Sequence, residues 1–172
     1  MSAHVVPLPL IPPAPPALDP TRFLPANREK LSAPGLRAFL GIAGLWGLTE
    51  QERLLVLGLP ARSTYHAWVR AAKGGGRITL PVDTLLRISA VLGIHKALRI
   101  LFATDVEAVA WLRGPHAALP FAGQAPLALV IGGTQDGLMA VRRFLDAARG
   151  GLFMPPNAAD APPLADADIV FA

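Results

Sequence analysis

The chain has 172 residues, with 52% hydrophobic residues, 16% charged residues and no cysteine. The lack of cysteine excludes disulfides, thiol catalysis and cysteine zinc sites, and the apolar content predicts a packed core rather than global disorder. The first twenty residues are apolar but lack the basic start of a signal peptide. No proline-free apolar run approaches the roughly 18 residues of a membrane helix, so we expect a cytoplasmic protein that does not contact membranes.

The net charge of +4 is unevenly distributed along the chain. Between Thr21 and Ile100 there are 12 Lys or Arg residues and four acidic residues, which gives this half a net charge of +8. From Leu101 onward the net charge is −3. A basic half followed by an acidic half predicts a polyanion, such as DNA, bound to one half and a different partner bound to the other.

Residues 1–31 are rich in proline, which cannot donate a backbone hydrogen bond, and we expect a flexible arm there. A helical period follows, with Ser32 as the expected N-cap, Pro34 in the first turn and Gly47 as the end. The expected inward face of this helix comprises four residues: Leu36, Phe39, Leu40 and Ala43.

The next segment has the proportions of a helix-turn-helix. Thr49 and Glu52 form the pattern of a capping box, which predicts a helix over residues 50–57. A Gly/Pro turn follows, and Ser63 can cap a second helix over residues 64–73.

In a helix-turn-helix the second helix enters the major groove, and its first residues contact base edges. Arg62 can pair with guanine or phosphate, and Trp68 is expected to lie in the core. Tyr65 can lie either in the core or at the DNA interface, and the sequence does not decide between the two. The residues predicted to form the DNA-binding surface are Arg62, Ser63, Thr64, Tyr65, His66, Arg70, Lys73 and Arg77.

Further helices are expected after the helix-turn-helix segment. Gly93 is expected to end one helix, and a separate short helix to follow over residues 94–102. We also expect a helix that ends before Gly114, a short helix over 127–131, and a final helix capped by Thr134. The large residues expected to be buried are Trp68, Leu92, Leu101 and Trp111.

No pattern typical of catalysis is present. The four histidines are dispersed, and neither a zinc-protease motif, a nucleophile elbow nor a P-loop occurs. We therefore expect no enzyme activity, no catalytic residues, no metal site and no cofactor.

Three linked blocks resemble the Xre/MbcA/ParS antitoxin family. They are the RISAVLGIHKAL stretch, the WLRGP turn, and the VRRFLDAARGG ending; STYHAWVR also resembles the recognition helix of that family. The resemblance covers residues 36–151. One departure is His116, which stands where many members carry a small polar residue.

The resemblance implies an all-α fold. An Xre-like helix-turn-helix DNA-binding domain over 32–103 would be followed by a helical toxin-binding domain over 104–151 and an extended tail over 152–172. The implied protein is a homodimeric antitoxin of a type II toxin–antitoxin system. It would bind a RES-type toxin, a class that consumes NAD, and repress its own operon by binding operator DNA.

The acidic half is not needed for DNA binding, so we assign the toxin to it. Arginines of the last helix can pair with toxin carboxylates, and the apolar end of the tail can serve as an anchor. The predicted toxin-binding residues are Trp111, Arg113, Arg142, Arg143, Ile169, Val170 and Phe171.

Two other functions fit the same sequence. One is a solitary transcriptional regulator whose C-terminal half only dimerises, which an adjacent toxin gene would argue against. The other is a protein-binding scaffold that does not contact DNA, which salt-dependent operator binding would exclude.

Overall fold

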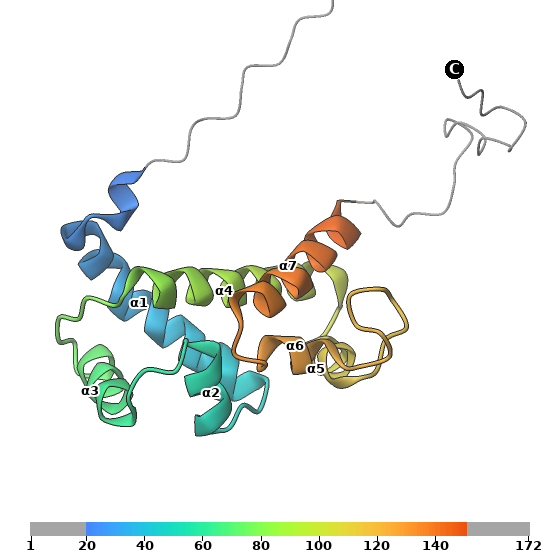
Figure 1. Ribbon diagram of the computed structural model, residues 1–172, viewed down its shortest axis with the longest axis horizontal. Coiled ribbons are helices and arrows are strands. Elements are labelled where there is room, and N and C mark those ends of the chain that lie inside the picture. The colour runs from blue at the N-terminus through green and yellow to red at the C-terminus, as the bar shows by residue number, and fades with distance from the viewer. Residues whose placement is uncertain (1–19, 151–172) are drawn as a thin grey trace, which may run out of the picture.

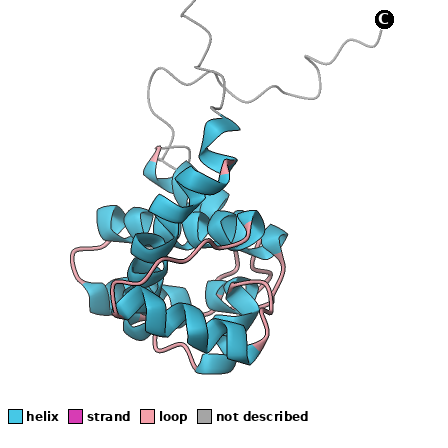
Figure 2. Cartoon of the chain, turned by 90° about the vertical axis from the view of Figure 1, so that its left-hand side faces the viewer, coloured by secondary structure: helices cyan, strands magenta, loops and turns pink. Residues whose placement is uncertain are grey.

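The computed structural model describes residues 20–150, which contain a short 3-10 helix and seven α-helices (Figures 1 and 2). The elements are η1 (Pro20–Phe23), α1 (Pro25–Leu45), α2 (Glu50–Val56), α3 (Arg62–Lys73), α4 (Val82–Leu101), α5 (Asp105–Arg113), α6 (Pro126–Val130) and α7 (Gln135–Arg149). Within this range no strand is present, so the expected all-α class is confirmed.

Helix α1 begins earlier than the sequence predicted. Pro25 starts it, and Pro34 lies inside it rather than in its first turn. Ser32 does not cap the helix, because its hydroxyl donates to the carbonyl of Arg28 at 2.6 Å and accepts from the amide of Leu80 at 2.9 Å. This buried serine therefore attaches α1 to the segment before α4.

The capping box at the start of α2 is confirmed. The Thr49 hydroxyl accepts from the amide of Glu52 at 3.3 Å, and the Glu52 carboxylate accepts from the amide of Thr49 at 2.7 Å. After α2 the chain turns through Gly58, whose φ of +88° suits glycine. A Cβ at this position would lie 2.8 Å from the Asp83 carboxylate, so glycine also lets the turn approach α4 closely.

The predicted break at Gly93 is wrong, because α4 continues through it as a single helix of 20 residues. Arg142 of α7 lies across α4 at this point, and a Cβ on residue 93 would overlap its guanidinium group. Gly93 thus leaves room for a crossing helix, which the sequence pattern could not distinguish from a helix end.

The core extends through both halves of this part of the chain. Its largest fully buried side chain is Trp46, which the sequence analysis did not single out. Of the residues expected to be buried, Trp68, Leu92 and Trp111 are half-buried and pack against this core. Leu101 is 38% exposed, contrary to expectation, because α4 ends there and Phe102 packs against Trp111 instead.

Helix α4 is the central element of the structure. It packs against α1 and against α7, with α2 and α3 toward one end and α5 and α6 toward the other (Figure 1). In both views η1 and the end of α7 project to the same side of α4. None of the helices within residues 20–150 is long and apolar enough to cross a membrane.

Candidate functional site

Helix α3 presents a polar, exposed face along most of its length. Six of the predicted DNA-binding residues lie on this helix and are exposed: Arg62, Ser63, Thr64, His66, Arg70 and Lys73. Tyr65 is only 4% exposed, so its side chain belongs to the core and we leave it out of the DNA-binding surface. Its i,i+3 and i,i+4 neighbours Trp68 and Val69 are half-buried, as expected for the inner face of this helix.

Glu50, the first residue of α2, holds two of these side chains. Its carboxylate lies 2.8 Å from Nε of Arg62 and 3.1 Å from Nε2 of His66. The hydrogen bond from His66, together with the charge of Arg62, lowers the pKa of Glu50 below its usual value. The contact places Arg62 and His66 side by side at the start of α3, where a recognition helix contacts bases.

The other basic residues continue this surface beyond α3. Arg77, in the loop after the helix, is paired with Glu29 of α1 although most of its side chain is exposed. Arg37 of α1 donates to the carbonyl of Ala72 at 2.8 Å and so fixes the last turn of α3. These contacts set the orientation of α3 on the rest of the fold.

In the second half, Trp111 organises an aromatic cluster. The centroid of its ring lies 4.7 Å from the ring centroid of His116, 5.9 Å from that of Phe121 and 6.1 Å from those of Phe102 and Phe144. His116 also forms a 2.7 Å hydrogen bond with the carbonyl oxygen of Trp111. The cluster fixes the loop between α5 and α6 against α5 and α7, so most of the Trp111 side chain is committed to packing.

Two of the arginines predicted to bind the toxin make internal contacts. Arg113 donates to the carbonyl of Trp46 at 2.5 Å, which links α5 to the turn after α1. Arg142 pairs with Asp146 at 2.7 Å and donates to the carbonyl of Ser89 at 3.4 Å. These interactions give both residues a role in the fold.

Arg143 is placed differently. Its side chain is 65% exposed and lies 3.3 Å from Asp136, at the start of the same helix. Its side chain is therefore more available to a partner than that of Arg142, which is 31% exposed. The three tail residues predicted as anchors, Ile169, Val170 and Phe171, lie outside the described residues.

Two exposed apolar side chains of this half were missed by the sequence analysis. Leu119, in the loop before α6, is 97% exposed, and Val106 on α5 is 79% exposed. The only sequence signal for Leu119 is its place in a loop before Pro120, which favours the surface without indicating a partner. Within residues 20–150, no three histidine, aspartate or glutamate side chains are grouped so as to hold a metal ion.

Comparison with known proteins identifies both halves of the chain. Residues 25–94 match the antitoxin Xre-like helix-turn-helix domain, and residues 97–151 match the antitoxin Xre/MbcA/ParS C-terminal toxin-binding domain. The chain belongs to the Xre/MbcA/ParS antitoxin family. It is also 39% identical over 134 residues to the uncharacterized protein y4oB of Sinorhizobium fredii, a match that covers 77% of this chain and 98% of y4oB.

In this member of the antitoxin family, the two matched segments meet inside a helix. The interval between residues 94 and 97 falls within α4, which spans Val82–Leu101. Helix α4 therefore contributes residues to both the helix-turn-helix domain and the toxin-binding domain.

Proposed function

We propose that this chain is the antitoxin of a type II toxin–antitoxin pair, that it neutralises a RES-type toxin that consumes NAD, and that it represses its own operon. The observation that carries the proposal is the joining of an exposed, basic recognition helix and a toxin-binding domain through one continuous helix, α4. One polypeptide can in this way bind DNA and toxin on separate surfaces.

The DNA-binding role rests on α3 and on its contact with Glu50. Arg62 and His66 are held next to each other at the start of the helix, and Arg70 and Lys73 can contact the flanking phosphates. A homodimer would place two such helices on a palindromic operator, with half-sites about one helical turn apart.

The toxin-binding role rests on exposed groups of the acidic half. Arg143 can pair with a carboxylate of the toxin, and Leu119 offers an apolar side chain that is 97% exposed. The tail over residues 152–172, with Ile169, Val170 and Phe171 at its end, would extend this surface. Coverage of the toxin's substrate cleft is sufficient for neutralisation.

The test is co-expression with a RES-type toxin encoded beside the antitoxin gene, followed by measurement of growth and of cellular NAD. We expect the full chain to restore both, and chains that end at Gly151 or carry Arg143→Glu to restore them poorly. Lys96→Glu, an equal charge reversal on exposed α4 surface, is the control.

Arg142→Glu is tested separately, because loss of its pairing with Asp146 can also loosen α7. If the truncated chain and Arg143→Glu both protect as well as the control does, neutralisation depends on neither the tail nor Arg143, and the exposed apolar side chains Val106 and Leu119 are the next to test. If the full chain binds its operator but never protects cells, it acts as a solitary transcriptional regulator.

A further inference from the structure

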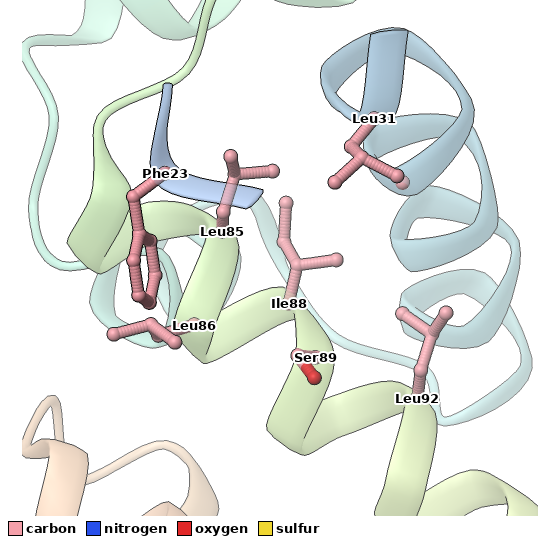
Figure 3. A pocket seen from close by; sticks show the side chains of 8 residues that line it. Phe23, Leu31, Leu85, Leu86, Ile88, Ser89 and Leu92 are labelled. Atoms are coloured by element: carbon pink, nitrogen blue, oxygen red, sulfur yellow. The ribbon is translucent and has the colours of Figure 1, made fainter. Parts of the chain in front are cut away.

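An apolar groove lies between α1 and α4, on a part of the surface that does not include α3 (Figure 3). Phe23 of η1 and Leu31 of α1 face Leu85, Leu86 and Leu92 of α4 across it. The groove has a volume of about 260 Å³, and Leu31 and Leu86 are 53% and 39% exposed. Such a contiguous apolar surface is unfavourable in water and favours an apolar occupant.

We propose that residues 5–18 of this same chain bind in the groove. These residues lie outside the part of the chain that the structure describes, and their composition matches the lining. The segment VVPLPLIPPAPPAL contains no charged residue, and six of its fourteen residues are prolines. Burial of charged side chains in an apolar groove would be costly, and this segment has none to bury.

The prolines also lower the cost of burying the backbone of this segment. An extended segment that enters an apolar groove must bury its amide N–H groups, and an unpaired buried N–H is unfavourable. Proline has no N–H, and proline-rich segments are already extended before they bind, so they lose little conformational entropy. Ser89, the polar residue of the lining, can donate its hydroxyl to a carbonyl oxygen of the segment.

The connection to the folded part makes this occupant accessible. The segment ends two residues before η1, and Phe23 of η1 is itself part of the groove. Fourteen extended residues reach about 45 Å, whereas the groove runs along about two turns of α4, or roughly 11 Å. The segment is therefore long enough to fold back from the start of η1 and cover the lining.

A second copy of the chain is the competing occupant. It would have to overcome the loss of translational and rotational freedom on association. A tethered segment avoids that loss, because a short connection presents it at a millimolar effective concentration.

The chain contains no cysteine, so a single cysteine can report on coverage of the groove. Leu86→Cys places it in the groove, and its rate of reaction with a maleimide is measured in native buffer without DNA or toxin. The rate is compared between the full chain, a chain that lacks residues 2–18, and a full chain with Leu8→Asp and Leu10→Asp. Leu31→Cys, on the opposite wall, gives a second reporter.

We expect both changes in the arm to raise the reaction rate roughly tenfold. This is the protection expected when the tethered segment has an effective concentration of about 1 mM and binds the groove with an intrinsic Kd of about 0.1 mM. Ala67→Cys, on the exposed face of α3, is the control and should react equally in all three backgrounds. Equal rates at Leu86→Cys in all three backgrounds would overturn the proposal. Protection that persists without residues 2–18 and increases with protein concentration would also overturn it, and would assign the groove to a second copy.

Discussion

The side chain of Arg87, inside α4, donates from Nη1 to the carbonyl oxygen of Gly133 at 2.9 Å. Its Nε atom also donates to Asp83 at 2.7 Å, and the residue is only 9% exposed. Gly133 precedes α7, so this arginine connects the helix-turn-helix half directly to the toxin-binding half. Both halves are thus held in one arrangement by a hydrogen bond as well as by apolar packing.

The first prediction concerns this connection. Arg87→Met retains much of the side-chain volume but leaves the Gly133 carbonyl without its donor, so we expect a loss of about 1–3 kcal/mol in the free energy of unfolding. Urea denaturation followed by circular dichroism measures it. Arg99→Met, at an exposed position of the same helix, is the control and should change stability by less than about 0.5 kcal/mol. Equal stability of the two variants would show that the hydrogen bond to Gly133 contributes nothing.

The second prediction concerns DNA. Arg62→Ala and Arg70→Ala remove exposed cations from α3, so each should weaken operator binding without a change in melting temperature. Loss of a phosphate contact should also reduce the magnitude of the negative slope of log K against log salt concentration by about one. Lys96→Ala on α4 removes the same charge elsewhere. If the two α3 variants bind the promoter fragment as tightly as Lys96→Ala does, α3 is not the recognition helix.

The third prediction separates packing from recognition in the toxin-binding domain. Trp111→Ala removes the centre of the aromatic cluster and should cost about 3–5 kcal/mol of stability, measured by urea denaturation. Leu119→Ser alters a side chain that is 97% exposed, so it should leave stability unchanged and weaken toxin binding. An unchanged unfolding midpoint for Trp111→Ala would contradict the role of this residue in packing.

The fourth prediction concerns pH. Burial lowers the pKa of His95, against the opposing effect of Asp105 and together with the charge of Arg99. The ring centroid of His95 lies 6.4 Å from that of Trp46. Because the unfolded chain takes up this proton first as the pH falls, stability should decrease below about pH 6.5.

His95→Gln removes this proton uptake, so its stability should depend less on pH between 7.5 and 5.5 than that of the unchanged chain. Urea denaturation at several pH values measures the difference. Lowered pKa values of Glu50 and Glu52 act in the same direction, but only in more acidic solution. A pH dependence that is identical in His95→Gln would show that His95 does not contribute to it.

Local signals in the sequence were sufficient for much of the fold. The capping box at Thr49 and the N-cap at Thr134 are determined by residues three positions apart, and the structure has both. Gly93 and Ser32 were misread because their roles come from residues distant in sequence, Arg142 in one case and Leu80 in the other. A glycine inside a helix and a glycine that ends one look alike until the neighbouring helix is known.

The same distinction applies to the candidate surfaces. The sequence indicated the basic face of α3, because a cluster of cations after a helical turn is a local pattern. It gave no indication that Glu50 holds Arg62 and His66, or that Arg113 is engaged by the carbonyl of Trp46. Such partners come together only through tertiary packing.

The most direct test of the central claim uses one variant and two readouts. Arg62→Glu combined with Arg70→Glu is expressed together with a cognate RES-type toxin, and operator binding and cellular NAD are both measured. If DNA and toxin occupy separate surfaces, the variant should lose operator binding and still keep NAD at the level seen with the unchanged antitoxin. Depletion of NAD in cells that contain the unchanged, folded chain would contradict the proposed neutralisation of the toxin.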